Sequence, residues 1–423
     1  MRTLLTGILL QMIGFAAGGQ APVELIGRDL SRTTVWLTKV EGDRLSWVDA
    51  DGSEGGATTP DILGLIATNP DAGSGVNPGS NPGAGGGNGA GLGTLDEVLS
   101  FQPAMLRLVD GRKLTGAPSG RIESATDEEG PLRWQHPVLG AVEVPLEQID
   151  RLVLQRTSLG PSRRAVLPPA DTDDLVLLRN GDRLRGFVVG IGRELAIETE
   201  AGVSRVPFEA IDQVALANPR ERWAGPMVWL RDGSVLGVTS VSFDGDTMTL
   251  NWQTDVDTEA EPDEPERSVA VPHELVRAVV FDSRRVVPLV DLLPAAEVER
   301  VSRVGASRAV GGPADDPPLG AEPLSLSGRD ELQLALPVGA ESLSLRAALP
   351  LRARAWGRGT LVVRLDGMVR ARLPVSASEP VADAVVQISG ASELSLGLEP
   401  GEFGEVHAEV SVMRAIIAID AEP

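Results

Sequence analysis

Residues 106–116 read Leu106-Arg107-Leu108-Val109-Asp110-Gly111-Arg112-Lys113-Leu114-Thr115-Gly116, and the same pattern returns twice further along the chain. The later copies are Leu177-Leu178-Arg179-Asn180-Gly181-Asp182-Arg183-Leu184-Arg185-Gly186 and Val228-Trp229-Leu230-Arg231-Asp232-Gly233-Ser234-Val235-Leu236-Gly237. Asp-Gly or Asn-Gly between two apolar segments is the strongest short-range signal for a β-hairpin. The glycine that ends each copy predicts a bulge or sharp bend in the second strand.

Each hairpin is followed by a closing element with a fixed internal spacing, in which two apolar residues stand four and seven positions after a proline. The three closing elements are Pro145…Ile149…Leu152, Pro207…Ile211…Val214 and Pro272…Val276…Val279. The spacing predicts a single 3₁₀ or short helical turn that leads into a last strand. Proline is expected at the first position of that turn because it has no N–H to satisfy. Repetition of such a unit is typical of proteins built for binding and spacing.

A divergent first copy is expected over residues 22–68. Val35-Trp36-Leu37 and Leu45-Ser46-Trp47-Val48 alternate like strands, and Asp51-Gly52 is a turn signal. Thr59 is expected in the place of the proline, with Leu63 at +4 and Ile66 at +7, and the opening Asp-Gly arm is missing. The unit resembles the small SH3-like or Sm-like barrel, and this resemblance implies the fold alone.

The sequence therefore predicts an all-β chain, with tandem SH3-like barrels stacked in a row and a C-terminal β-sandwich or jelly roll. The expected parts are a signal peptide at 1–19, a divergent barrel at 22–68, a flexible Gly/Pro-rich linker at 69–98, barrels at 99–156, 173–219 and 226–283, and the jelly roll at 287–423. The barrel at 226–283 carries an acidic insert, which we expect to be a solvated hairpin tip.

The C-terminal part carries four motifs in a characteristic order: Val290-Asp291-Leu292-Leu293-Pro294, Pro323-Leu324-Ser325-Leu326-Ser327-Gly328, Val363-Arg364-Leu365-Asp366-Gly367 and Ala391-Ser392-Glu393-Leu394-Ser395-Leu396. This order resembles that of NPCBM-type domains, which are carbohydrate-binding modules with a galactose-binding-like jelly roll. The resemblance covers about residues 287–420 and implies sugar binding. Glu331-Leu332-Gln333-Leu334 stands where the family has a glycine-rich segment with a histidine, so we expect weak sugar binding or none.

Trp356 is the candidate sugar-binding residue, because it stands between Arg354 and Arg358 in a segment that joins two expected strands. A loop tryptophan can stack on a sugar ring while neighbouring arginines bond its hydroxyl groups. The alternative is that Trp356 closes the end of the sandwich.

Composition excludes several classes of function. The net charge of −22 disfavours nucleic acid and anionic membrane surfaces as partners. The chain has no cysteine, which excludes disulfides, thiol catalysis and zinc–thiolate sites. His136, His273 and His407 lack ligand spacing, and neither a Gly-x-Ser-x-Gly elbow nor a P-loop is present. We expect no catalytic residue, no metal and no cofactor.

The N-terminus is typical of an export signal. Arg2 supplies the positive charge, residues 3–17 are largely apolar, and Ala17-Gly18-Gly19 predicts cleavage after Gly19. The apolar segment is shorter than the roughly 20 residues of a spanning helix. An uncleaved anchor is the alternative. We expect no transmembrane segment after removal of the signal, and a location in the periplasm, at the cell surface or outside the cell.

Together these features predict an exported, non-enzymatic binding or scaffold protein of a bacterial cell envelope with a C-terminal carbohydrate-binding module. The expected partners are envelope or extracellular polysaccharides, and proteins that bind the repeats. The alternative is a structural scaffold that self-assembles or binds proteins without binding sugar. An enzyme of unrecognised type is a third hypothesis.

Overall fold

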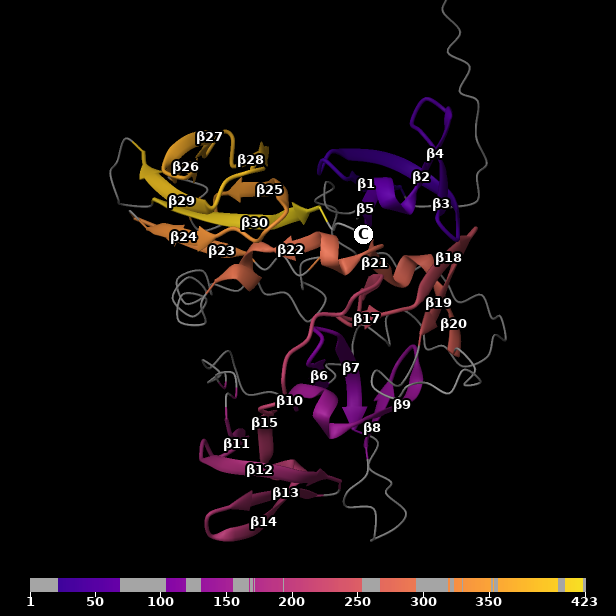
Figure 1. The fold of residues 1–423 in the computed structure, drawn as a ribbon, viewed down its shortest axis with the longest axis vertical. Coiled ribbons are helices and arrows are strands. Elements are labelled where there is room, and N and C mark those ends of the chain that lie inside the picture. Colours follow the sequence, from indigo (N-terminus) through magenta and orange to yellow (C-terminus); the bar gives the residue numbers. More distant parts are fainter. Residues whose placement is uncertain are drawn as a thin grey trace, which may run out of the picture.

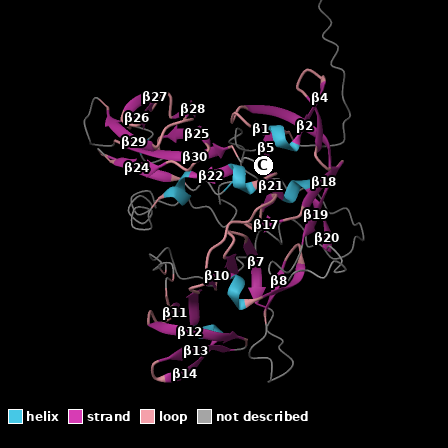
Figure 2. Cartoon of the chain, in the orientation of Figure 1, coloured by secondary structure: helices cyan, strands magenta, loops and turns pink. Residues whose placement is uncertain are grey.

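The computed structural model describes residues 22–68, 104–118, 131–154, 167, 170, 172–192, 194–252, 267–293, 319, 323–328, 330–350, 353, 357–401 and 408–420. The expected signal peptide, the linker at 69–98 and the acidic insert lie outside these residues. Figure 2 shows strands joined by loops and single helical turns, which confirms the all-β class. None of the described helices has the length and apolar character needed to cross a lipid bilayer.

The four repeats each contain five strand positions and one 3₁₀ turn before the last strand, and they are called here the first to fourth units. The first unit comprises β1 (Val23–Gly27), β2 (Arg32–Glu41), β3 (Arg44–Val48), β4 (Glu54–Thr58), η1 (Thr59–Asp61) and β5 (Ile62–Ala67). The second comprises β6 (Ala104–Leu108), β7 (Lys113–Pro118), β8 (Leu132–His136), β9 (Gly140–Val144), η3 (Leu146–Gln148) and β10 (Ile149–Val153).

The third unit comprises β11 (Asp174–Leu178), β12 (Arg183–Ile191), β13 (Glu194–Thr199), β14 (Gly202–Pro207), η4 (Phe208–Ala210) and β15 (Ile211–Ala215). In the fourth unit the second strand is split, so its elements are β16 (Met227–Leu230), β17 (Val235–Gly237), β18 (Ser240–Asp244), β19 (Thr247–Trp252), β20 (Arg267–Pro272), η5 (His273–Leu275) and β21 (Val276–Val280). In every unit the last strand pairs with the first, and the first to fourth strands pair in sequence, all antiparallel.

The hairpin turn between the first two strands has the same geometry in all four units. Gly111, Gly181 and Gly233 occupy equivalent positions with φ of 89°, 95° and 91°. In the first unit Leu30 takes this position with φ of 61°. The preceding Asp29 accepts a hydrogen bond from the Ser31 N–H at 2.9 Å, as the Asp or Asn does in the other three turns. The first unit therefore has the opening arm that the sequence analysis expected to be missing, with leucine in place of glycine.

The closing element begins one residue earlier in the first unit than the sequence analysis predicted. Ile62 follows η1 as Ile149 follows η3, so the apolar positions are Ile62 and Leu65, which face the core of the unit. Leu63 and Ile66 point to the opposite face. Side chains of a strand alternate between faces, so an error of one residue exchanges the buried sets.

Proline also takes a different place in the closing turn than the sequence analysis predicted. Pro145, Pro207 and Pro272 each cap the 3₁₀ turn from the position before it, with φ of −58°, −57° and −53°. Two of these residues also end a strand, since β14 and β20 run up to Pro207 and Pro272. The fixed φ of proline is compatible with both roles.

The glycines that end the hairpins allow the second strand to pass from one neighbour to the next. β12 pairs with β11 as far as Gly186 and with β13 from Phe187 onward. A Cβ atom on Gly186 would lie 2.0 Å from the carbonyl oxygen of Glu198, and one on Gly116 would lie 2.1 Å from that of Gln135. The predicted bend is therefore required by backbone contact at these positions.

The units associate in two similar pairs through their closing strands. β10 pairs with β15 so that Leu152 lies opposite Val214, and β5 pairs with β21 so that Leu65 lies opposite Val279. All four residues stand at the +7 position of their closing elements. The backbone hydrogen bonds beside these pairs also match. The N–H of Leu154 donates to the carbonyl oxygen of Asp212 at 3.0 Å, and the N–H of Phe281 donates to that of Leu63 at 3.2 Å. In both pairs the donor stands two residues after the +7 position, and the acceptor stands two residues before that of the partner unit.

The spatial order of the units is first, fourth, second, third, which differs from a row in sequence order. β17 pairs with β7 at Val235 and Lys113, which joins the two pairs (Figure 1). Apolar side chains of all four units form one cluster. Each unit contributes fully buried residues to it, for example Val35, Leu106, Val176 and Val228. The row is therefore built from two pairs of units with a common core.

The C-terminal part is a sandwich of two antiparallel sheets. It is entered through η6 (Ser283–Arg285), β22 (Val286–Pro288) and η7 (Leu289–Leu292). One sheet contains β22, β23 (Leu324–Ser327), β25 (Ala340–Ala348), β28 (Val381–Gln387) and β30 (Glu409–Ile419). The other contains β24 (Glu331–Ala335), β26 (Arg358–Leu365), β27 (Met368–Ser376) and β29 (Glu393–Pro400). Apolar side chains of both sheets fill the space between them, as in other sandwiches.

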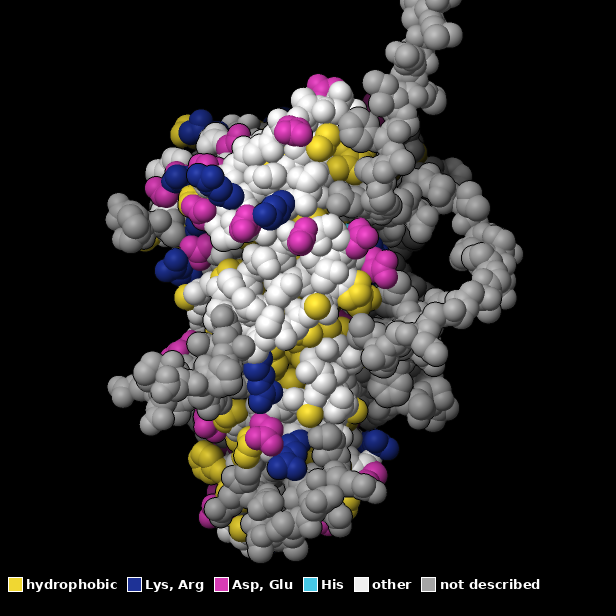
Figure 3. Space-filling model, turned by 90° about the vertical axis from the view of Figure 1, so that its right-hand side faces the viewer, with side chains coloured by type: hydrophobic (Ala, Val, Ile, Leu, Met, Phe, Trp, Pro, Cys, Tyr) yellow, Lys and Arg dark blue, Asp and Glu magenta, His cyan; other side chains and the backbone are white. Residues whose placement is uncertain are grey.

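The sandwich packs on the pair formed by the first and fourth units. Val286, Ile416 and Ala418 of the sandwich join an apolar cluster with residues of the first and fourth units, namely Ile26, Leu30, Leu63, Ile66, Trp229, Val235, Ala278 and Val280. Arg285 donates to the carbonyl oxygen of Pro60 at 2.6 Å at the edge of this contact. Figure 3 shows one outer face of the molecule, on which acidic and basic side chains lie interspersed.

Replacing Gly186 by alanine should destabilise the protein by about 1–3 kcal/mol, because the new methyl group would force the Glu198 carbonyl to move. Chemical denaturation measures the loss. Gly56→Ala is the control, since the nearest atom to its Cβ would be the Leu45 carbonyl oxygen at 3.2 Å. Equal losses in the two variants would contradict the assigned role of the bend.

Replacing Leu30 by glycine should relieve the left-handed backbone but remove a fully buried side chain from the contact with the sandwich. The burial outweighs the strain, so a net loss of roughly 2 kcal/mol in the free energy of unfolding is expected. Denaturation monitored on the full chain measures it. Unchanged or increased stability would show that the leucine is strained without compensation.

Candidate binding site

A buried polar network joins the second and fourth units, and it contains a serine, a histidine and an aspartate. His136 and Ser234 are fully buried, and Nε2 of His136 lies 2.8 Å from Oγ of Ser234. Oγ of Ser234 lies 2.7 Å from Oγ1 of Thr115, which donates to Asp232 at 2.8 Å. The same residue types in this proximity occur in catalytic triads, so the direction of each bond decides what the network can do.

The bonds to the histidine place its proton on the wrong nitrogen for a general base. Nδ1 of His136 accepts from the backbone N–H groups of Val138 and Leu139 at 3.1 and 3.0 Å. Nε2 must therefore carry the proton and donate it to Ser234, which leaves no lone pair to receive the serine proton. Burial lowers the pKa of His136 to about 4, although the negative charge of Asp232 acts in the opposite direction. The arrangement fits a neutral network that holds two units together.

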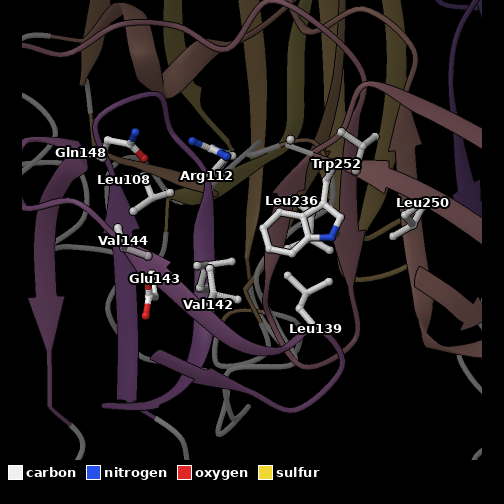
Figure 4. Close-up of a pocket in the computed structure, with 13 residues that line it drawn as sticks. Leu108, Arg112, Leu139, Val142, Glu143, Val144, Gln148, Leu236, Leu250 and Trp252 are labelled. Carbon is white, nitrogen blue, oxygen red and sulfur yellow. The ribbon is translucent and has the colours of Figure 1, made fainter. Parts of the chain in front are cut away.

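Next to this network lies a narrow crevice between the two units. Leu139 and Val142 face Leu236 and Trp252 across it, and Arg112 lies at one end (Figure 4). Its volume of ≈ 20 Å³ leaves room for about one water molecule. The crevice is a packing defect of an interface and is too small for a sugar.

A larger hollow lies at one end of the C-terminal sandwich, with a volume of ≈ 460 Å³. The loop between β24 and β25 and the loop between β28 and β29 form its walls, and Asp420 after β30 completes it. Pockets for small ligands have volumes of roughly 300–1,000 Å³. The hollow therefore has the size of a site for one or two sugar rings.

Polar groups line one side of the hollow. Glu341 and Asp420 contribute carboxylates that are 36% and 45% exposed, and Ser389 donates to the backbone carbonyl of Glu341 at 3.2 Å. Arg28, from the hairpin turn of the first unit, lies 3.6 Å from Glu341 and forms an ion pair with Asp420. Two of the residues that line the hollow are thus paired with an arginine of the first unit.

Apolar groups line the rest of the hollow. They are Leu336, Pro337, Val338, Ala340 and Ala391. Val338 is 98% exposed. Carboxylates beside small apolar side chains can bond sugar hydroxyl groups and contact the apolar face of a ring, but the described lining contains no aromatic ring.

Of the sequence-predicted site, the structure describes only Arg358. Arg354 and Trp356 are outside the described residues, and Arg358 is exposed at the start of β26. The other end of β26 leads to Asp366, which accepts hydrogen bonds from Ser392 beside the hollow. With 8 residues, β26 separates the two ends by roughly 23 Å at about 3.3 Å per residue. A sugar-binding role for Trp356, Arg354 and Arg358 stays a prediction.

No sequence motif marked Glu341 and Asp420 of the hollow or Arg28 beside them. Arg28 could have been found by aligning Gly27–Ser31 with the other hairpin turns, since they share the Asx bond of Asp29. No pattern links Arg28 to Glu341 or Asp420, because they come from parts of the chain that meet only in the folded protein. His136 also gave no signal of its burial, while His273 is half-buried beside Asp246 and His407 lies outside the described residues. Within the described ranges, no group of three or more His, Cys, Asp or Glu side chains could hold a metal ion.

Comparison with known proteins finds likeness only among solved structures. No family model matches the sequence, and no curated protein matches it. The CBM51 domain of Clostridium perfringens GH95, solved with methyl-galactose, is similar at 13% identity and a TM-score of 0.22, over 23% of this chain and 70% of that chain. CBM51-2 with the INT domains of Clostridium perfringens ZmpB is similar at 12% identity and a TM-score of 0.25, over 46% of this chain and 43% of that chain. The catalytic-domain structure of a GH87 alpha-1,3-glucanase with nigerose is similar at 14% identity and a TM-score of 0.17, over 25% of this chain and 23% of that chain.

Acid should weaken the fold through His136. Its pKa is about 4 in the folded protein against an ordinary 6.5, so between these values the unfolded chain binds a proton that the folded one does not. The free energy of unfolding should fall as the pH drops through this window, by up to about 3 kcal/mol from this group. Denaturation at pH 7 and pH 4 measures the loss.

The variant His136→Gln should be less stable at pH 7 but should lose less on acidification than the parent. His273→Gln serves as the control, and it should keep the parent's pH dependence. If all three proteins lose the same free energy between pH 7 and pH 4, the buried histidine does not carry the acid sensitivity.

Proposed function

We propose that this chain is an exported, non-enzymatic binding protein whose C-terminal sandwich binds a carbohydrate. The observation that supports this best is the open hollow of ≈ 460 Å³ at the end of the sandwich, with carboxylates and a serine beside small apolar side chains. Sugars present hydroxyl groups and apolar ring faces together, which such a lining can satisfy. The ordered motifs of an NPCBM-type module in the same part of the chain are consistent with this function.

The non-enzymatic character of the proposal rests on the chemistry of the buried network. His136 donates to Ser234 and cannot act as its base in the folded state, and both side chains are closed off from solvent. Glu341 and Asp420 both pair with Arg28, and neither carboxylate belongs to the buried network.

A scaffold without sugar binding is the second candidate, and an exposed apolar patch on the third unit supports it. Phe187 is 58% exposed and Val203 is 60% exposed, and they lie in register with Glu198 of β13 between them. Val189 on β12 is 42% exposed. Apolar side chains grouped on the outer face of an end unit are typical of contacts with another protein.

Titration calorimetry of the full chain against galactose, N-acetylglucosamine and neutral oligosaccharides tests the sugar-binding function. We expect weak binding, with Kd roughly in the millimolar range, because the described lining offers few polar groups and no aromatic platform. Glu341→Gln should weaken binding if the hollow is the site, and Trp356→Ala should weaken it if the sequence-predicted residues form the site. Glu379→Gln, an exposed change away from the hollow, is the matched control.

Absence of binding to every sugar tested would overturn the proposed function. In that case, light scattering at several protein concentrations should reveal self-association that Phe187→Ser abolishes, as the scaffold hypothesis predicts. Sugar binding that all three variants retain would support the function and place the site on another surface.

A further inference from the structure

Four arginines gather on the outer face of the second unit, and they are called here the arginine cluster. Arg107 lies on β6 and Arg151 on β10, while Arg220 and Arg222 belong to the segment between β15 and β16. Asp150 and Asp291 are the acidic residues that pair with them. The cluster therefore has two more positive than negative charges, on a chain whose net charge is −22.

The aspartates neutralise only part of the cluster. Arg220 donates to one oxygen of the buried Asp150 through Nε at 2.9 Å and Nη2 at 2.7 Å. Nε of Arg107 lies 3.5 Å from the other oxygen of Asp150, and Arg222 makes a single contact of 3.4 Å to Asp291. Arg107, Arg220 and Arg222 remain 50%, 47% and 46% exposed. Several of their N–H groups are thus open to a ligand from solvent.

Arg151 contributes a buried N–H group that has no acceptor. Its Nε atom is buried and has no hydrogen-bond partner. Burial lowers the pKa of Arg151; Asp150 acts against this, and the charges of Arg107 and Arg220 add to it. A buried donor without an acceptor costs roughly 1–3 kcal/mol, and more when it is charged. The positive charge of Arg151 is therefore only partly compensated by the neighbouring side chains.

The pairing of β6 with β10 brings two arginines of the cluster together. Arg107 and Arg151 lie directly opposite each other on β6 and β10, and like charges in this position destabilise a sheet. The equivalent cross-strand pairs are Ile26 with Gly64, Leu177 with Gln213, and Trp229 with Ala278. The other units thus show that this position does not require charge, and only the second unit places two arginines there.

We propose that the arginine cluster binds an oxyanion, a carboxylate, sulfate or phosphate group, whose oxygens take the exposed N–H groups of Arg107 and Arg222 and whose negative charge compensates that of Arg151. Guanidinium groups match such anions because their N–H donors form a planar fork. An anion would also remove the repulsion between Arg107 and Arg151. This site is independent of the hollow in the sandwich. The anion can be a free ion or the acidic group of a polymer, and the experiment separates these sources.

The test compares ligands at constant ionic strength by the thermal stability of the full chain and by calorimetry. Sodium sulfate and sodium phosphate probe the free ion against sodium chloride, and polygalacturonate and dextran sulfate probe the polymer against neutral dextran. Arg107→Gln and Arg222→Gln should each weaken binding about tenfold, as expected for a charge-assisted bond. Arg133→Gln, an equally exposed arginine of the same unit, is the control and should leave binding unchanged.

Arg151→Met separates a binding role from a structural one. If the cluster is a binding site, this variant should unfold at a higher temperature than the parent without anion and should lose the stabilisation by anion. A lower unfolding temperature without anion would mean that Arg151 stabilises the fold and would overturn the proposal. So would the absence of any anion-dependent stabilisation, or an equal loss of binding in Arg133→Gln.

Discussion

Antiparallel pairing of the closing strands is the interaction on which the rest of this structure depends. In each unit the closing strand already pairs with the first strand on one edge, so its other edge would expose a row of unpaired N–H and C=O groups. Pairing of β10 with β15 and of β5 with β21 satisfies both edges at once. Each pairing also places two apolar residues at the +7 positions opposite each other. A unit of about 45–60 residues gains a shared core in this way, which small domains need for stability.

The two pairs of units have the same internal geometry but different outer faces. On the pair formed by the first and fourth units, Ile26, Trp229 and Ala278 create an apolar platform, and the sandwich covers it. On the other pair, the equivalent positions of the second unit hold Arg107 and Arg151. The repeat thus supplies one framework, and a few side chains at fixed register positions decide whether its face is apolar or charged.

The joints between units carry the unusual local features of the molecule. Leu30 keeps a left-handed backbone, and its buried side chain contacts the sandwich, where the other units have glycine. Ser234 follows Asp232-Gly233 in the turn of the fourth unit and reaches His136 of the second. In both cases a residue of the hairpin turn contacts another part of the chain. The hairpin turn therefore serves as a contact element as well as a strand connection.

Local patterns in the sequence determined the secondary structure of this protein. Asp-Gly and Asn-Gly turns, the bend glycines and the proline-led closing elements all act within a few residues, so they can be recognised without knowing the fold. Where the pattern was weak, in the first unit, a shift of one residue was enough to exchange Leu63 for Ile62 in the core. The sequence of the four C-terminal motifs likewise indicated a β-sandwich, and two packed sheets are present there.

Only the tertiary structure decided which units meet and which side chains form sites. The order first, fourth, second, third follows from complementary strand edges and platforms that are far apart in sequence. Glu341 and Asp420 of the hollow pair with Arg28, and the buried network combines His136 with Ser234. Each of these side chains is unremarkable in its own segment. Their roles arise from contacts over long sequence separations, which depend on how complete elements pack and which no local pattern encodes.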